Sequence, residues 1–234
     1  MKPEQAKLIH DDQLALYRHI DSNIEKKLAH TKHTPSCSKG CDSCCKIMTL
    51  ISLSEAVTMA WPLLQKPDWR ELLPKLRESA QAMSPIGLSE LEYALQRRPC
   101  VFLRDAACSM YSTRPGACRT YLVMTPKEQC DASNSREISS LDTLHEKAVI
   151  MGEGIRIFGD HIGSVFAPLP LMVLHAFRLM VPEATRPVVD AALKGLPNPA
   201  IWIQAKMGET RDRISPEEEV QARAALQEMG VMPR

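Results

Sequence analysis

Apolar residues recur with the period of an α-helix along most of the chain, while strand-like alternation is scarce. The first predicted helix covers residues 12–29, where Leu14, Tyr17, Ile24 and Leu28 lie on one face. This pattern predicts a mainly α protein.

A capping signal marks the start of the next predicted helix. Ser52 and Glu55 have the spacing of a capping box, in which each side chain bonds to the backbone of the other residue. Pro62 has no N–H to donate within a helix, so the helix that begins at Ser52 is predicted to stop before it.

Further helices are predicted in the second half of the chain and around residue 80. They are expected over residues 69–83, 89–96, 141–158, 170–180 and 182–193, with a last helix from Ser215 to Gly230. Because Pro74 has no N–H, the first of these either begins near Leu73 or is kinked. Residues 99–130 contain three prolines and no long periodic run, which predicts loops, turns and one extended segment. Residues 131–140 have the composition of an exposed linker.

These elements suggest a two-part organisation. We expect a helical domain over residues 1–135 with a loop-borne cysteine cluster, and a C-terminal helical extension over 136–234 packed on it. The alternative is that both parts form one domain.

Composition narrows the function classes. The formal net charge is +1 and aromatic residues make up 5%, which gives no reason to expect nucleic acid or an anionic membrane as partner. The start of the chain lacks a basic segment followed by an apolar one, and the apolar stretch 165–177 is short and contains two prolines. We therefore predict a cytoplasmic protein, a compartment in which thiols are kept reduced.

All the cysteines lie between residues 37 and 130. They are Cys37, Cys41, Cys44, Cys45, Cys100, Cys108, Cys118 and Cys130. Core packing would use cysteine as a small apolar residue, and disulfides would need an oxidising compartment. Metal ligation fits best, because thiolates are soft ligands that suit zinc, copper(I) and iron–sulfur clusters.

Two kinds of metal centre are compatible with this number of thiols. They could form two four-cysteine zinc sites, or one iron–sulfur cluster with spare thiols. Arg114 and Arg119 could offset the negative charge or donate hydrogen bonds to sulfur, and the Tyr111 hydroxyl could do the same. The surplus of thiols and the doubled Cys44 and Cys45 slightly favour the cluster.

The spacing of Cys37, Cys41 and Cys44 also resembles that of the radical S-adenosylmethionine enzymes, whose three cysteines hold a four-iron cluster. That family needs a barrel of alternating strands and helices, which this sequence does not predict. It also leaves Cys45 and the four later cysteines without a role.

A second resemblance covers more residues. The stretches "CSKGCDSCC" (37–45), "IMTLISLSEA" (47–56) and "CVFLRDAACSMYSTRPGACRTY" (100–121) resemble the YkgJ-type cysteine-cluster family, the CxxCxxCC zinc- or iron-chelating domain. The likeness covers roughly residues 35–131. It departs from the family once, because three residues separate Cys37 from Cys41 where the family has two.

The resemblance implies metal chelation, by iron or zinc, and no particular reaction. We therefore predict a metal-binding protein. The alternative is a metal- or cluster-dependent enzyme that modifies a protein substrate or has another redox role, since a flagellin lysine methylase carries a similar cysteine domain.

Overall fold

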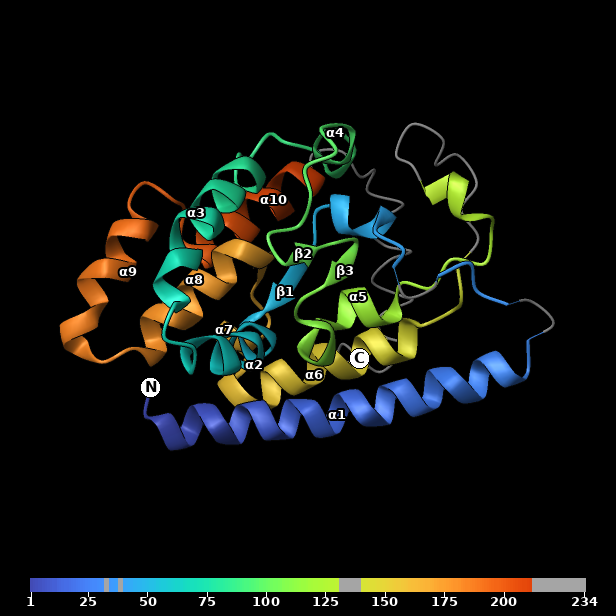
Figure 1. Ribbon diagram of the computed structural model, residues 1–234, viewed down its shortest axis with the longest axis horizontal. Helices are drawn as coiled ribbons and strands as arrows, with labels where there is room; N and C mark the ends of the chain where they lie inside the picture. The colour runs from blue at the N-terminus through green and yellow to red at the C-terminus, as the bar shows by residue number, and fades with distance from the viewer. Residues whose placement is uncertain (32–33, 38–39, 131–139, 212–234) are drawn as a thin grey trace.

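The structure, a computed structural model, describes residues 1–31, 34–37, 40–130 and 140–211. Most of the described chain is helical, which confirms the mainly α prediction (Figure 1). The predicted linker, but for residue 140, and the last predicted helix lie outside the described residues. No described helix combines the length and the apolar character that crossing a lipid bilayer requires.

In chain order, with η for a short 3₁₀ helix, the elements are α1 (Pro3–Ala29), η1 (Ser43–Lys46), β1 (Leu50–Ser52), α2 (Leu53–Leu64), η2 (Trp69–Glu71), α3 (Leu72–Met83), α4 (Glu90–Leu95), β2 (Leu103–Arg104), β3 (Ala107–Cys108), η3 (Tyr111–Thr113), α5 (Gly116–Thr120), η4 (Lys127–Cys130), α6 (Leu144–Phe158), α7 (Asp160–Gly163), β4 (Phe166–Pro168), α8 (Leu169–Met180), η6 (Glu183–Thr185), α9 (Arg186–Leu193) and α10 (Pro199–Arg211).

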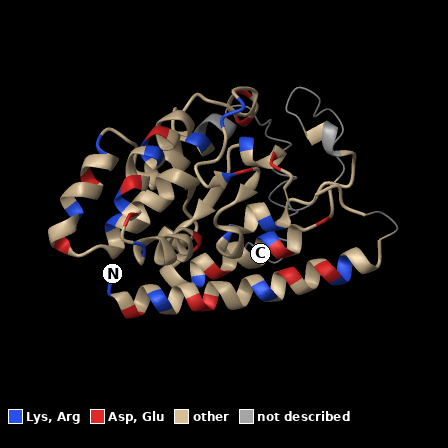
Figure 2. Cartoon of the chain, in the orientation of Figure 1, with Lys and Arg blue, Asp and Glu red and all other residues tan. Residues whose placement is uncertain are grey.

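Helix α2 lies at the centre of the helical packing. It contacts α1 on one side and α8 on another, and α3 and α9 pack on α8 in turn. The long helix α1 runs along one edge of the molecule, with charged residues of both signs distributed along it (Figures 1 and 2). Strand β1 pairs antiparallel with β4, so the start of α2 is tied to the start of α8.

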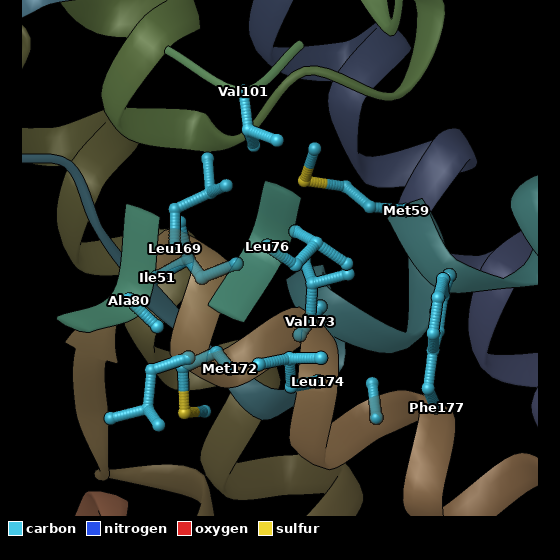
Figure 3. Packing of buried hydrophobic residues seen from close by; sticks show 14 of the residues in the cluster. Ile51, Met59, Leu76, Ala80, Val101, Leu169, Met172, Val173, Leu174 and Phe177 are labelled. Carbon is cyan, nitrogen blue, oxygen red and sulfur yellow. The ribbon is translucent and has the colours of Figure 1, made fainter. Parts of the chain in front are cut away.

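One cluster of buried residues fills the space between α2, α3 and α8 (Figure 3). It includes Ile51, Leu76 and Leu174, which are fully buried. Trp69 and Phe177 meet edge to face, with ring centroids 5.5 Å apart, an arrangement that aromatic pairs prefer. The core therefore joins residues from both halves of the chain.

Helix α2 continues through Pro62 to Leu64, so the prediction that it stops before Pro62 is wrong. A proline at position 62 leaves the carbonyl of Thr58 without its usual helical donor. The His10 side chain of α1 fills that vacancy, with its Nδ1 2.9 Å from the Thr58 oxygen. A contact from another helix thus replaces the missing backbone hydrogen bond.

Two glycines allow α6 and α7 to come into backbone contact. A Cβ atom on Gly154 would lie 2.8 Å from the carbonyl oxygen of Gly163, and one on Gly163 would collide with the backbone of Gly154. Gly154 weakens the helix prediction for α6 by its propensity, yet here it is needed for packing. Gly152 in the same helix has open space around it.

We expect Gly154→Ala to lower the free energy of unfolding by about 2 kcal/mol, because the new methyl group meets rigid backbone. Gly152→Ala is the matched control and should be neutral or stabilising by up to about 1 kcal/mol, since alanine favours the helix. Denaturant unfolding followed by circular dichroism measures both. Equal effects of the two substitutions would contradict the close contact.

Candidate metal centre

Loops and short elements carry the cysteines and bring them to one region of the molecule. All eight are partly buried free thiols. They lie on the segment that ends in η1, around the β2–β3 hairpin, on α5 and at the end of η4. Helix η1 contacts η4, so the doubled cysteines lie near the segment that ends in Cys130.

Backbone hydrogen bonds hold these segments together. The N–H of Cys100 donates to the Cys45 carbonyl at 2.7 Å. The N–H of Ser36 donates to the Val123 carbonyl at 2.9 Å, and the Val123 N–H in turn points to the Cys37 sulfur at 3.3 Å. Two of these contacts are main chain to main chain and bring together segments that are distant in sequence, and the third uses the Cys37 sulfur itself.

A tight hairpin positions two more thiols. Asp105 and Ala106 connect β2 to β3 with positive φ angles of 47° and 57°, as in the two-residue turns that fit the twist of paired strands. Cys108 pairs with Leu103 across the hairpin, and Cys100 lies three residues before β2. The hairpin therefore presents both thiols at its open end.

Main-chain N–H groups also face the hairpin sulfurs. The Phe102 N–H bonds to the Cys100 thiol and the Met110 N–H to the Cys108 thiol, and each bond lowers the pKa of its thiol. Burial acts more strongly in the opposite direction, raising the pKa of Cys100 to about 11 and that of Cys108 above its usual value. N–H donors of this kind stabilise ligated thiolates.

Four thiols influence one another through their charges. Burial raises the pKa of Cys118, and the nearby thiols of Cys44, Cys100 and Cys108 raise it further. The pKa of Cys100 is raised in the same way by Cys108 and Cys44, after burial. Cys44, Cys100, Cys108 and Cys118 therefore lie within reach of one another's charges, and they are here called the inner thiols.

We call the remaining cysteines, Cys37, Cys41, Cys45 and Cys130, the outer thiols. Cys44 links the two sets, because its thiol is hydrogen-bonded to that of Cys45. This hydrogen bond raises the pKa of Cys44, and burial raises it further. Burial also raises the pKa of Cys37, with a smaller contribution from Cys44 and Cys41.

Tyr121 is a site residue that the sequence reasoning missed. Burial raises the pKa of its phenol, followed by the charges of Cys130, Cys44 and Cys37. The ring therefore lies near thiols from two segments, the one that ends in η1 and the one that ends in η4. Its position directly after "CRT" in the second cysteine stretch was the available signal.

Arg114 is the cation that affects the largest number of the thiols in the described part of the chain. It lowers the pKa of thiols from both sets, namely Cys37, Cys44, Cys108 and Cys118. Its guanidinium carbon lies 4.2 Å from the centroid of the Tyr111 ring, which is 55% exposed. Stacking on Tyr111 therefore holds Arg114 beside the cysteines.

Arg119 has a different environment. Its guanidinium is buried and forms an ion pair with Asp21 of α1 at 2.5 Å. It also donates to the carbonyls of Ser112 and Arg114 and stacks on the Tyr17 ring at 4.2 Å. The structure thus places Arg119 between α1 and the loop before α5.

Glu55 connects the cysteine region to the helical core. This carboxylate is only 2% exposed. One oxygen accepts hydrogen bonds from the Gly116 N–H at 2.7 Å and the Tyr17 hydroxyl at 3.2 Å. The other accepts from the N–H and hydroxyl of Ser52, which confirms the predicted capping box. Because Gly116 begins α5, Glu55 also fixes the helix that carries Cys118.

The donor set suits a soft metal. Thiols converge from several segments, N–H groups face three of the sulfurs, and one arginine offsets their charge. Among residues 1–31, 34–37, 40–130 and 140–211, however, no three Cys, His, Asp or Glu side chains are arranged to hold one ion. The assignment of individual cysteines as ligands stays a prediction.

Comparison with known families identifies the cysteine region. Residues 36–141 match a family model named CxxCxxCC and described as "Putative zinc- or iron-chelating domain". The match confirms the resemblance found in the sequence and extends slightly beyond it. No curated protein and no solved structure matches the chain.

We expect Glu55→Ala to lower the free energy of unfolding by about 3 kcal/mol or more, because the buried donors of Gly116, Ser52 and Tyr17 lose their acceptor. Cys118 should also react faster with iodoacetamide, because α5 loses its anchor. Denaturant unfolding and mass spectrometry of the alkylated peptides measure the two effects.

Ser52→Ala is the matched control, since it removes the cap but leaves Glu55 bonded to Gly116 and Tyr17. It should cost about 1 kcal/mol and leave the alkylation of Cys118 unchanged. If Glu55→Ala were no more harmful than Ser52→Ala, the link from Glu55 to α5 would be refuted.

Proposed function

Because residues 36–141 match the CxxCxxCC family model, we propose that the protein binds iron, as an iron–sulfur cluster, or zinc through its cysteine thiolates. The observation that carries this proposal is that the inner thiols, which come from three segments of that region, act on one another through their charges. Family membership supports metal binding in general, and the local chemistry supports the choice of ligands.

The inner thiols are our first choice of ligands. Buried thiols repel one another when ionised, and this repulsion raises the pKa of Cys118 in addition to burial. A bound cation removes that repulsion, so this group gains more from a metal than isolated surface cysteines would. Four thiolates around Zn²⁺ carry a net charge of about −2, which Arg114 is placed to offset.

The outer thiols would complete the centre. The Val123 N–H donates a hydrogen bond to the Cys37 sulfur, and the Cys45 thiol is hydrogen-bonded to that of the inner thiol Cys44. A second set of thiols directly beside the first suits a polynuclear centre better than one closed zinc site. For this reason we favour an iron–sulfur cluster, with two four-cysteine zinc sites as the alternative.

The three non-cysteine residues would have supporting roles. Arg114 would balance thiolate charge, and Tyr111 would orient Arg114 through the stacked contact. Arg119 would have an indirect role, because its ion pair with Asp21 fixes the loop before α5 against α1. The backbone N–H groups of Phe102 and Met110, which donate to the thiols of Cys100 and Cys108, would stabilise these as ligated thiolates.

The metal is tested by purifying the full chain without oxygen and measuring iron, zinc, acid-labile sulfide and the visible absorption spectrum. An iron–sulfur centre gives iron, sulfide and a broad charge-transfer band. Colourless protein with stoichiometric zinc would reject the cluster in favour of the zinc alternative, and protein without either metal after incubation with each would reject metal binding.

Two substitutions test the ligands. Cys118→Ser should lose most of the bound metal, whereas Cys41→Ser, a change in the outer thiols, should lose less. Circular dichroism checks that both variants fold. Full metal content in Cys118→Ser would exclude the inner thiols as the main ligands.

Metal binding should also release protons. Burial keeps thiols such as Cys100 and Cys118 protonated at neutral pH, because it raises their pKa. Each ligating thiol must lose its proton, so about one proton per thiol should be released and zinc affinity should rise between about pH 6 and pH 9. A pH indicator in weak buffer and chelator competition measure these quantities. Zinc affinity independent of pH would contradict thiolate ligation.

A further inference from the structure

A cleft of about 570 Å³ lies beside the cysteine region, between α1 and residues 111–122. None of the residues that line it is a cysteine. Its size is within the range of sites that bind small molecules.

Some of the side chains that line the cleft already have partners within it. Arg119 bonds to Asp21 and stacks on Tyr17, and both contacts hold these side chains in place. These groups shape the cleft, and the charges of Arg119 and Asp21 largely cancel.

Two other arginines of the lining are not paired in this way. Within the described part of the chain, neither the Arg18 nor the Arg114 side chain has a hydrogen bond or an ion pair, and the Nε of Arg114 is buried without a partner. Arg18 is exposed on α1 and contributes to lowering the pKa of Asp11. Arg114 is held on the opposite wall by Tyr111. Planar guanidinium groups with free donors match the geometry of a carboxylate.

The remaining lining sets the charge and shape of a ligand. Arg18, Arg114 and Arg119 face two acids, Asp21 and Glu25, so the lining has a surplus of one positive charge. That surplus suits a singly charged anion better than a dianionic phosphate. The other lining side chains include several aliphatic ones, namely Leu14, Ile24, Leu28 and Leu122.

We propose that this cleft binds a small organic carboxylate, with its apolar body against the aliphatic side chains and its carboxylate on Arg114 and Arg18. The site goes beyond the proposed metal centre and uses different side chains, except for Arg114, which lies between the two. Binding here therefore does not require that the cysteines hold a metal.

The test is titration of the full chain with 4-methylbenzoate, followed by ligand-observed saturation-transfer NMR. The neutral analogue 4-methylbenzamide and the cationic 4-methylbenzylamine are titrated in parallel. We expect the carboxylate to bind at least about 10-fold more tightly than the amide, since charge-assisted hydrogen bonds are lost with the amide. Preference for the amine, equal binding of the amide, or no binding of the carboxylate would overturn the proposal.

Substitutions locate the binding site. Arg114→Gln and Arg18→Gln should each weaken carboxylate binding about 10-fold or more. Lys7→Gln makes the same change of charge on α1 at a residue paired with Asp11, away from the cleft, and should leave binding unchanged. Unchanged binding in both arginine variants, with unchanged melting temperatures, would also overturn the proposal. Metal content of Arg18→Gln, measured on the same sample, separates this result from a failure of the metal centre.

Discussion

The buried carboxylate of Glu55 is the constraint on which the arrangement of the cysteine region depends. A charge inside a protein is costly unless hydrogen bonds replace its hydration. Here the donors come from three elements, with Tyr17 on α1, Ser52 at the start of α2 and Gly116 at the start of α5. Satisfying one carboxylate therefore sets the relative positions of three helices. A side chain at position 116 would collide with Ile150 and crowd Glu55, so this contact requires glycine.

The sequence predicted the local features of the fold well. The capping box at Ser52 and the helical character of most of the chain are confirmed. Helix α1 starts at Pro3, earlier than predicted, and of its predicted apolar face Tyr17 and Ile24 are buried while Leu14 and Leu28 are half-buried. Long-range contacts explain the failures. Helix α2 passes Pro62 because His10, far away in sequence, supplies the missing donor. Helix α10 was not predicted, and its Trp202 is buried with its indole N–H on the Ser84 carbonyl.

The candidate site shows the same division between local and distant information. The cysteine stretches predicted a resemblance to the CxxCxxCC domain, and the match of residues 36–141 to that family model confirms the resemblance. Cysteine spacing could not distinguish the environment of Arg114 from that of Arg119, because both arginines lie within the same motif. Their roles differ through contacts with other elements, since Asp21 on α1 draws Arg119 away while Tyr111 keeps Arg114 beside the thiols. Glu55 was visible only as a cap, because its bond to Gly116 spans 61 residues.

The pairing of β1 with β4 has a consequence for synthesis of the chain. Leu50 pairs with Pro168, and α8 immediately after it supplies Leu174 and Phe177 to the core of α2 and α3. All the cysteines are translated before these partners leave the ribosome. During that interval the apolar faces of α2 and α3 lack their cover, and the thiols emerge on a nascent chain whose core is incomplete. The core that α2 and α3 share with α8 can therefore close only after residue 177 has been added.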